Sequence, residues 1–385
     1  MSDKKIAHVV TDEKFINSVH WQFEEVFPCQ NTFFVFVDDF HSSFNHIKFN
    51  DGIIKIKKEE ESIKLLNKKL DEYDVVVLHS LSYYHSILVN NTKNLDKFVW
   101  SFWGGEFYNN PEVRFKFPMV GDITNRKLLG RNRFMTILKS IKNRFFKYFQ
   151  VRKSSWSLIS KAAKKIDRIA VIHREDVEML KEYNYVKANA KYIQFSYYPL
   201  EYVFKNYDQI DLGNNILVGN SATPTNNHGE VFELLSKFSL GDRKIIVPLS
   251  YGNEDYAKKV NYLGRNIFKD SFLPLMDFMS FNEYNKLIQQ CGIVVINTYR
   301  QQAIGNILTL LWMGAKIYLD NRNTFFNYLK RKGFIVLSIN EDLNINNSNA
   351  LLPLSIDEKK HNRDILKKET SKEKLFSILK NEFGK

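Results

Sequence analysis

Residues 292–314, GIVVINTYRQQAIGNILTLLWMG, form a pattern of a buried strand that leads into a helix through a polar junction. The run Gly292–Asn297 is apolar and β-branched, which suits a strand covered on both faces. The run Ile304–Met313 is long and apolar enough for a helix packed on such a sheet. The junction therefore predicts a ligand site, because ligands of open α/β sheets bind at the carboxyl ends of strands. The polar junction contains Arg300, Gln301, Gln302, Gly305 and Asn306.

This junction has the chemistry of a diphosphate site. A helix N-terminus exposes unpaired N–H groups and a partial positive charge, so it favours a phosphate group. Arg300 would add a permanent cation that offers paired hydrogen-bond donors. Gln301 and Gln302 are costly to place where their amides find no partner, which favours a functional role for them.

Strand and helix patterns alternate along the whole chain and predict an α/β fold with parallel sheets covered on both faces. A length of 385 residues fits two such sheets better than one. The expected strands are Lys5–Val10, Thr32–Val37, Val75–His79, Phe98–Trp103, Arg168–His173, Ile216–Gly219, Lys244–Leu249, Ile293–Asn297, Lys316–Leu319 and Ile335–Ser338. The expected helices are Glu13–Phe27, Glu59–Leu70, His228–Phe238, Glu254–Arg265, Phe281–Gln290, Ile304–Met313, Thr324–Lys332 and a charged one over Asp357–Phe383.

The composition indicates a folded protein in a reducing compartment. Apolar residues make up 44% of the chain and aromatic residues 14%, which is enough for real hydrophobic cores. Cys29 and Cys291 lie far apart and suggest neither a disulfide framework nor a CxxC metal site. We expect a cytoplasmic setting, no signal peptide and no membrane span, since no run approaches the ~20 apolar residues that a span needs.

The net charge of +13 indicates either an anionic partner or a lysine-rich genome. The segment Arg126–Lys153 contains many Lys and Arg residues and no Asp or Glu, and its Phe and Leu residues recur at roughly helical spacing. A basic amphipathic helix of this kind suits an anionic membrane surface. A helix packed on its own domain, with a solvated basic face, is the alternative. We expect no nucleic-acid partner, because no recognised binding module accompanies the charge.

Two more polar loops follow expected strands in the second half. The loop VGNSATPTNNHGE, Val218–Glu230, contains a glycine for close backbone approach, several hydroxyl groups and two asparagines that can cap the next helix. It lacks the GKS/T ending of a P-loop, so it is either a diphosphate or sugar loop or an ordinary capped loop. In the turn PLSYG, Pro248–Gly252, Tyr251 could stack on a nucleobase; a generic turn is the alternative.

In the first half of the chain, one expected strand ends within the run WSFWGGEFY, Trp100–Tyr108. Aromatic faces and a carboxylate are suited to hold a sugar ring and to remove a hydroxyl proton, which makes Glu106 the first candidate for a base. The alternative is a glycine turn with a solvated Glu106. His79, at the end of another strand, is the second candidate base, although a structural histidine fits equally well.

No sequence pattern predicts a metal site. The chain shows no convincing DxD, HExxH or CxxC signature, and the adjacent Asp38 and Asp39 side chains would point apart in an extended segment. A nucleotide-sugar enzyme without a metal must neutralise the leaving diphosphate with a helix dipole, backbone donors and cations. The Gly219 loop and the Arg300 junction would supply these, so we expect no cofactor.

Together these motifs resemble glycosyltransferase family 56. The resemblance is carried by VGNSATPTNNH, PLSYG, WSFWGGEFY and FNEYNKLIQQCGIVVINTYRQQAIGNILTLLWMGAKIYL, and it is strongest from about 217 to 337. It implies a GT-B architecture, in which two Rossmann-like doubly wound domains face each other across a cleft. It also implies transfer of 4-acetamido-4,6-dideoxygalactose (Fuc4NAc) from a dTDP-sugar to a polyprenyl-diphosphate-linked saccharide. In named members this reaction builds enterobacterial common antigen.

The resemblance also implies a domain plan and a location. Residues 1–208 would form the acceptor domain with the basic segment 126–153, residues 209–350 the nucleotide-sugar domain, and residues 351–385 a helical segment that packs back on the first domain. The basic segment would bind the anionic inner leaflet, which places the protein peripherally at the cytoplasmic face of the bacterial inner membrane.

Carried over by position, the resemblance assigns roles to particular residues. The donor side comprises Gly219, Asn220, Ser221, Asn226, Asn227, His228, Ser250, Tyr251, Gly252, Tyr284, Arg300, Gln301, Gln302, Ile304, Gly305 and Asn306. The acceptor side comprises Trp103, Gly104, Gly105, Glu106 and Tyr108. Arg300 and the helix that begins near Ile304 would stabilise the departing dTDP. Glu106, then His79, would deprotonate the acceptor of an inverting enzyme, whereas a retaining enzyme needs no such strong base.

Two alternatives stay open at this point. The same fold could serve capsule or O-antigen synthesis with another nucleotide sugar, because specificity lies in a few pocket contacts. A non-catalytic protein that binds a membrane surface or nucleic acid would depend on the basic segment, but it would leave the polar loops without a purpose.

Overall fold

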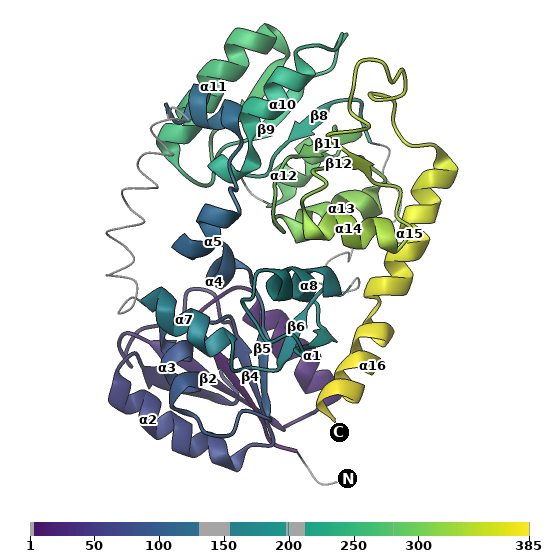
Figure 1. Ribbon diagram of the computed structural model, residues 1–385. Coiled ribbons are helices and arrows are strands. Elements are labelled where there is room, and N and C mark those ends of the chain that lie inside the picture. The colour runs from purple at the N-terminus through teal and green to yellow at the C-terminus, as the bar shows by residue number, and fades with distance from the viewer. Residues whose placement is uncertain (1–3, 131–154, 198, 200–211, 280, 385) are drawn as a thin grey trace. The chain divides into compact units, whose positions relative to one another are not determined.

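The computed structural model describes residues 4–130, 155–197, 199, 212–279 and 281–384. These residues divide into two compact α/β units, coloured by position along the chain in Figure 1. The first unit contains the residues up to Phe117, those from 155 to 199 and those from Thr370 onward. The second contains 118–130 and the described residues from 212 to Glu369.

The described residues of the first unit form a parallel sheet of seven strands in the order β3-β2-β1-β4-β5-β6-β7. The chain moves outward from β1 to β3 and then returns to the other side of β1, so the strand order reverses between β1 and β4. The strands are β1 Ile6–Val10, β2 Asn31–Val37, β3 Ile53–Lys57, β4 Val75–His79, β5 Phe98–Ser101, β6 Arg168–Val171 and β7 Lys191–Gln194. The helices are α1 Ile16–Val26, α2 Glu60–Lys69, α3 Tyr83–Asn91, α4 Gly105–Tyr108, α5 Pro111–Lys116, α7 Ser155–Ala163, α8 Arg174–Glu182 and α16 Lys372–Phe383.

The C-terminal helix α16 completes the core of the first unit. It lies beside α1 (Figure 1), and Leu379 and Phe383 are buried against Val19 and Phe23 of that helix. The central strands β1 and β4 are buried along their whole length, as expected for β-branched runs covered on both faces. Helix α16 is therefore part of the same hydrophobic core as the N-terminal helix α1.

The described residues of the second unit form a parallel sheet of six strands in the order β10-β9-β8-β11-β12-β13, which reverses between β8 and β11. The strands are β8 Ile216–Val218, β9 Ile245–Pro248, β10 Phe272–Leu275, β11 Ile293–Ile296, β12 Lys316–Leu319 and β13 Leu337–Ser338. The helices are α10 His228–Leu235, α11 Glu254–Phe268, α12 Phe281–Ile288, α13 Ile304–Met313, α14 Thr324–Arg331 and α15 Ile356–Thr370. Both units are doubly wound, as the sequence predicted.

The expected elements agree with the structure at the strongly apolar runs and differ at weaker ones. Strands β4 and β12 and helix α13 have the expected bounds, and the remaining expected strands and helices shift by a few residues at their ends. Strands β3, β7 and β10 were not expected, because IIKIK, KYIQ and FLPL are short and interrupted by polar residues or proline. The single helix expected over Asp357–Phe383 is two helices, since Ser371 caps the start of α16 by accepting a hydrogen bond from the Lys374 amide.

The expected domain boundary needs a correction. Residues 118–130, expected in the N-terminal domain, belong to the second unit, where Leu128 is buried in the hydrophobic core. They include the π-helical segment Thr124–Leu128. The C-terminal segment is also divided, because nearly all of α15 belongs to the second unit and α16 to the first. The rest of the expected basic helix, residues 131–153, lies outside the described residues.

Candidate active site

Most of the predicted donor residues lie at the edge of the second sheet that the carboxyl ends of its strands form. The strands are parallel, so the loops after β8, β9, β11 and β12 all leave the same edge. The strand order reverses between β8 and β11, which is the position at which ligands of doubly wound sheets bind. The residues predicted from Gly219 to Asn306, apart from Tyr284, come from three of these loops and from the start of the helix after β11.

Gly219 permits the tight turn after β8. Its φ angle is +69°, and an added Cβ would lie 2.9 Å from His228 Nε2 and 3.1 Å from Asn226 Oδ1. Asn226 holds the loop from inside: its Oδ1 accepts from the Asn220 amide at 3.2 Å, and its Nδ2 donates to the Ser221 carbonyl at 2.9 Å. The sequence motif is therefore a tightly packed loop in which a glycine faces a histidine.

Asn226, Asn227 and His228 are fully buried, which changes the role predicted for them. Asn227 Nδ2 donates to the Asn297 carbonyl at 2.8 Å, and its Oδ1 accepts from the Gly121 amide at 2.8 Å. His228 Nδ1 lies 3.0 Å from the Tyr256 hydroxyl, and burial lowers the pKa of His228 to about 3. These three side chains build the loop, and a donor could contact them only if the loop opened.

The junction after β11 has the predicted form. Helix α13 begins at Ile304, and Ala303 precedes it in the left-handed region at φ +59° with no side-chain cap. The amides of the first helical residues, Ile304, Gly305 and Asn306, consequently have no side-chain capping partner, and all three residues are partly exposed. This helix end retains its partial positive charge and can accept an anion.

The N-terminus of α10, by contrast, is closed. The Gly229 amide donates to Thr124 Oγ1 at 3.0 Å, and the Glu230 carboxylate accepts from the Ile123 amide at 2.8 Å and from Thr124. The segment 118–130, which supplies the Thr124 cap, is the one reassigned to the second unit. Of the two helix ends at the strand reversal, α13 is therefore the one suited to phosphate.

Arg300 and the two glutamines lie where the loops after β8 and β11 meet. Gln302 joins the loops, because its Nε2 donates to Asn220 Oδ1 at 3.0 Å and its Oε1 accepts from Thr225 Oγ1 at 2.9 Å. Arg300 Nη1 donates to the Gln301 carbonyl at 3.1 Å, and the side chain is half-buried. The guanidinium is thereby held near the start of α13.

Three residues after β12 support this junction and were missed by the sequence reasoning. Asn323 Nδ2 donates to the Arg300 carbonyl at 2.9 Å and to the Thr298 carbonyl at 3.1 Å. Arg322 binds the buried Asp320 through two contacts of 2.7 Å and stacks 3.4 Å above the ring of Tyr299. The available signal was the run DNRN directly after the strand Lys316–Leu319, because polar residues in that position face the ligand edge.

Tyr251 and Tyr284 have different surroundings. Tyr251 is 78% exposed on the turn after β9, and the Ala222 amide fastens that turn by donating to the Tyr251 carbonyl at 2.7 Å. Its ring is therefore accessible, and its stacking on a nucleobase stays a prediction. Tyr284 does not belong with the donor loops: burial and then the nearby Cys291 thiol raise its pKa to about 12, and Cys291 precedes β11 at the opposite edge of the sheet. Ser250 and Gly252 flank Tyr251 on the turn.

The first candidate base, Glu106, is buried and only 5% exposed. Its Oε1 accepts from the Trp100 indole at 3.0 Å and from the Trp103 amide at 3.1 Å. Burial raises the pKa of Glu106, and hydrogen bonds from its own amide, Trp103, Trp100 and the Leu81 amide oppose the rise. The carboxylate is thus neither a solvated turn residue nor a group that an acceptor hydroxyl can reach in this structure.

The second candidate base, His79, is completely buried at the end of β4. Its Nε2 lies 3.1 Å from His8 Nδ1, and its Nδ1 lies 3.0 Å from the Tyr197 hydroxyl. Burial, followed by the neighbouring His8 and His85, lowers the pKa of His79 well below the usual value. A neutral, enclosed imidazole of this kind is a poor proton acceptor.

The other acceptor-side residues also need corrections. Tyr108 is a core residue, 2% exposed, whose hydroxyl lies 3.3 Å from Met179 Sδ. Gly104 has a φ of +92° and packs against the ring of Tyr108, while Gly105 is the first residue of the short helix α4. Of the predicted acceptor side chains, Trp103 is the one that combines an aromatic ring with partial exposure.

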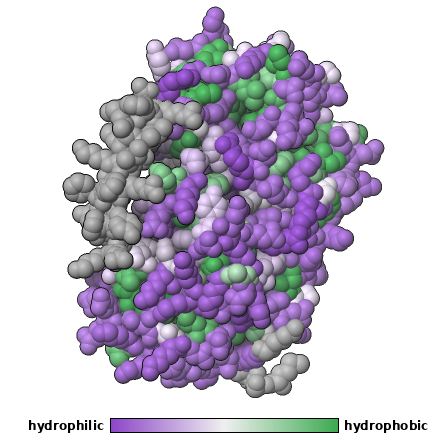
Figure 2. Space-filling model, viewed as in Figure 1, coloured by the Kyte–Doolittle hydropathy of each residue, from purple (hydrophilic) through white to green (hydrophobic). Residues whose placement is uncertain are grey.

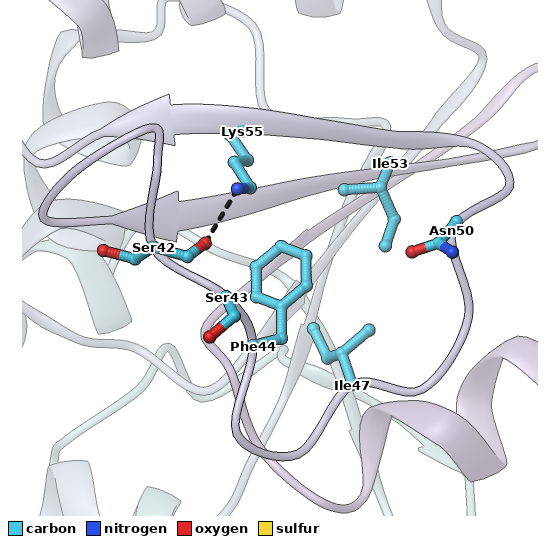
Figure 3. A pocket seen from close by; sticks show the side chains of 7 residues that line it. All are labelled: Ser42, Ser43, Phe44, Ile47, Asn50, Ile53 and Lys55. Atoms are coloured by element: carbon cyan, nitrogen blue, oxygen red, sulfur yellow. Dashed lines mark hydrogen bonds between the residues drawn. The ribbon is translucent and has the colours of Figure 1, made fainter.

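A pocket of about 540 Å³ lies elsewhere in the first unit, in the connection between β2 and β3 (Figure 3). Lys55 reaches across it and donates to the Phe40 carbonyl at 2.6 Å and to the Ser42 carbonyl at 2.8 Å. Because the Lys55 ammonium group is bound to these two loop carbonyls, the pocket offers little charge to a ligand. It is lined by Ser42, Ser43, Phe44, Ile47, Asn50, Ile53 and Lys55.

Across the described residues, no group of three or more His, Cys, Asp or Glu residues is placed to hold a metal ion. Within the same residues, no helix has both the length and the apolar character needed to cross a bilayer. The described residues on the face shown in Figure 2 are mostly hydrophilic, with small apolar areas.

Two doubly wound parallel units define the GT-B class of glycosyltransferases, and solved structures agree. HepE from Anabaena in complex with UDP is similar over 99% of both chains, with a TM-score of 0.63 and 10% identity. Sucrose-phosphate synthase from Thermosynechococcus elongatus is similar over 99% of this chain and 98% of its own, with a TM-score of 0.58 and 9% identity. At such low identities the likeness shows the fold.

The particular family follows from the sequence match. The family described as 4-alpha-L-fucosyltransferase, glycosyl transferase group 56, matches residues 146–352, which is more than half of the chain. The chain therefore belongs to glycosyltransferase family 56 and is an enzyme that transfers a sugar. The non-catalytic alternative is thereby excluded.

Proposed function

We propose that this glycosyltransferase moves a Fuc4NAc-like deoxyamino sugar from dTDP to a polyprenyl-diphosphate-linked saccharide in the synthesis of a bacterial surface polysaccharide. The observation that carries the donor half of the proposal is the open N-terminus of α13 beside Arg300, at the point where the strand order reverses. The family description names a fucosyl group, and Fuc4NAc is likewise a 6-deoxy sugar.

The chemistry of the leaving group matches this site. As the bond between the sugar and the diphosphate breaks, negative charge grows on the phosphate oxygen that departs. The amides of Ile304, Gly305 and Asn306 and the guanidinium of Arg300 would stabilise that charge without the cost of reorganising solvent. The exposed ring of Tyr251 would cover one face of the thymine. The proposal includes no metal and no other cofactor.

The first test is calorimetric titration of the purified full chain with dTDP, UDP and GDP, each with and without EDTA. The expected result is preferential binding of dTDP that is unchanged by EDTA. Preference for UDP or GDP would overturn the donor assignment, and loss of binding in EDTA would overturn the metal-free site. Absence of binding by all three nucleotides would overturn the assignment of the donor to this sheet edge.

Arg300 offers a sharper test of the same site. Arg300→Ala should weaken dTDP binding at least tenfold, because the cation beside the diphosphate is lost. Arg300→Lys should recover part of the affinity, since it restores the charge and not the paired donors. Arg265→Ala removes an exposed arginine on α11 and serves as the matched control, with affinity equal to that of the wild type. Equal affinity for the Arg300→Ala variant would contradict the proposal.

A transferase of capsule or O-antigen synthesis that uses a UDP-sugar is the second candidate function. It is favoured by the fold likeness to HepE, which was solved in complex with UDP and glucose. The two candidates differ in the nucleotide and in the sugar, so a panel of nucleotide sugars in a thermal-shift assay separates them. Only the true donor should raise the melting temperature strongly, because it binds the folded state alone.

The membrane half of the proposal rests on the basic segment 126–153. Of its described residues, Lys127 forms an ion pair with Glu233 at 2.8 Å. The full chain should sediment with vesicles rich in phosphatidylglycerol and be released by about 0.5 M salt. Equal binding to uncharged phosphatidylcholine vesicles would count against an electrostatic anchor.

A further inference from the structure

Three half-buried aromatic rings lie together at the carboxyl end of the first sheet. Phe15 follows β1, Trp103 follows β5 and Tyr197 follows β7. The ring centroids are 6.0 Å apart for Phe15 and Trp103, 5.7 Å for Phe15 and Tyr197, and 6.0 Å for Trp103 and Tyr197. We refer to these three residues as the aromatic platform. The platform lies near the point where the strand order of the first sheet reverses, between β1 and β4.

The polar atoms of the platform are bound to each other and to the protein. The Trp103 indole N–H donates to the Tyr197 hydroxyl oxygen at 2.7 Å, and Ser101 Oγ lies 2.6 Å from the same oxygen. Ser101 is fully buried beneath it. Because the polar atoms of Trp103 and Tyr197 are engaged, a ligand would contact mainly the apolar faces and edges of these partly exposed rings.

A buried chain of hydrogen bonds fixes the proton of Tyr197. Asn31 Nδ2 donates to Glu24 Oε1 and to the Phe27 carbonyl, both at 2.8 Å, so Asn31 Oδ1 must be an acceptor. It accepts from His8 Nε2 at 3.3 Å, which leaves His8 Nδ1 to accept from His79 Nε2 at 3.1 Å.

The same reasoning reaches the end of the chain. His79 Nδ1 is left as an acceptor, and the Tyr197 hydroxyl donates to it at 3.0 Å. Tyr197 then accepts from Trp103 and from Ser101, which uses both lone pairs of its oxygen. Burial keeps both imidazoles neutral, because it lowers the pKa of His8 to about 3 and that of His79 well below its usual value. The hydroxyl group is thus held by three partners of defined polarity.

Glu106 supports the platform from the other side. Its carboxylate accepts from the backbone amide of Trp103 and from the indole of Trp100. The two residues that the sequence indicated as bases therefore converge on one feature: Glu106 holds the backbone of Trp103, and His79 holds the hydroxyl that binds its indole. Neither side chain is open to a substrate in this structure, since their exposed fractions are 5% and 0%.

We propose that the aromatic platform binds the acceptor saccharide, and that Glu106 and His79 are positioning residues that orient its rings. A pyranose has an apolar face of C–H groups and a polar rim, which suits aromatic rings whose polar atoms are already satisfied. The proposal rests on the proposed function, in which a saccharide is the acceptor. An isoprenoid chain is the competing occupant that the experiment must separate from it.

Binding is tested by saturation-transfer NMR on the full chain with two probes, methyl N-acetyl-β-D-glucosaminide and geranyl diphosphate. The expected result is saturation of the ring C–H protons of the saccharide, reduced at least fivefold in Trp103→Ala and at least threefold in Tyr197→Phe. Tyr83→Phe, a change at another exposed tyrosine of the first unit, should match the wild type. A Trp103-dependent signal from the geranyl probe alone, or no saccharide signal in the wild type, would overturn the proposal.

The positioning roles are tested by conservative variants in a transfer assay. Glu106→Gln keeps an oxygen for the Trp103 amide, so its turnover should stay within about tenfold of the wild type, with an unchanged pH profile. His79→Gln should raise KM for the acceptor more than it lowers kcat. If Glu106→Gln instead lowered turnover at least a hundredfold and shifted the pH profile, Glu106 would be a base and the assignment would be overturned.

Calorimetry with dTDP separates the two proposals. The platform variants should bind dTDP as the wild type does, because the donor loops belong to the second unit. Loss of saccharide binding with intact nucleotide binding supports the platform, whereas intact saccharide binding without nucleotide binding would refute the donor site and leave the platform in place. Melting curves of each variant show whether it is folded.

Discussion

At the scale of the residue, the candidate site is organised by side chains that are buried in this structure. Asn226, Asn227 and Asn323 are buried: Asn226 fastens its own loop after β8, whereas Asn227 and Asn323 each bind backbone groups of another loop. An amide suits this task, because it offers a donor and an acceptor at once and carries no charge into the interior. The residues predicted to bind the donor include Asn226 and Asn227, which hold the loop after β8 in shape.

Gly219 gives the first prediction at this scale. Gly219→Ala should destabilise the protein by about 2–3 kcal/mol, since it adds a strained φ and a contact with the buried His228. Gly241→Ala is the matched control, because its φ is +56° and no atom lies within 4 Å of the added Cβ. It should cost about 1 kcal/mol, the backbone contribution alone. Urea unfolding measures both, and equal losses would show that the His228 contact is unimportant.

Asn323 gives the second prediction at the scale of the residue. Asn323→Ala removes the cap on the Phe325 amide and the donors to Arg300 and Thr298, so we expect a loss of about 2 kcal/mol and weaker dTDP binding. Asn323→Asp keeps the capping oxygen but turns the donor into an acceptor that faces two carbonyl groups. If the tie to Arg300 matters, Asp should impair nucleotide binding in calorimetry at least as much as Ala. Normal binding with Asp would assign the residue to capping alone.

At the scale of the element, the ends of two helices decide where an anion can bind. Helix α10 begins after β8 with its Gly229 amide capped by Thr124, and α13 begins after β11 without a side-chain cap. The electrostatic potential of a helix acts mainly within its first turn, so capping removes the site. A sequence motif that contains a helix start is therefore an anion site only if tertiary neighbours leave it open.

A substitution at the cap of α13 tests this difference. Ala303→Asp places a carboxylate at the N-cap, where it should stabilise the helix and compete with the diphosphate. We expect dTDP affinity to fall about tenfold while the melting temperature stays equal or rises. Ala303→Asn has nearly the same shape without the charge and should lose much less affinity. Equal affinities for the two variants in low salt would place the diphosphate elsewhere.

At the scale of the whole molecule, buried histidines set the response to acid. His8, His79 and His85 lie in the core of the first unit, and His228 lies in the second. Burial is the main cause that lowers their pKa values: to about 3 for His8 and His228, to about 4 for His85, and well below the usual value for His79. Below pH 6.5 the unfolded chain binds protons that the folded chain does not, so stability falls as the pH drops from about 6.5 toward 4.

The size and distribution of this effect can be measured. At pH 5.5 each of these four histidines, His8, His79, His85 and His228, should cost about 1 kcal/mol relative to pH 8. Glu106, whose pKa is raised by burial, acts in the opposite direction. Urea unfolding between pH 8 and 5 should show the steeper loss in the first unit, which has three of the four. His228→Gln should reduce the pH slope of the second unit, and His41→Gln, a change at an exposed histidine, should not. A slope unaffected by His228→Gln would refute this origin.

Much of the element pattern could be predicted from the sequence, because the strongest signals are local. The buried strands β4 and β12 and the helix α13 were predicted with their observed bounds, since each is a mostly apolar run whose backbone hydrogen bonds follow from its own pattern or from parallel neighbours. Strands β3 and β10 escaped prediction, because lysine and proline interrupt them. Helix α13 and its preceding Arg300 were recognised as a candidate anion site for the same local reason.

The sequence by itself determined two parallel α/β units, the loops at strand ends and the residue at which α13 begins, because short-range periodicity and residue type dictate these features. The tertiary structure decided that this helix start is left open. Only the tertiary structure decided that Glu106 and His79 are enclosed, that Asn227 binds Gly121, and that the segment before Gly130 caps α10. Their partners lie from 3 to more than 100 residues away. Nothing in a polar side chain's own sequence neighbourhood specifies whether water or a distant strand will satisfy it.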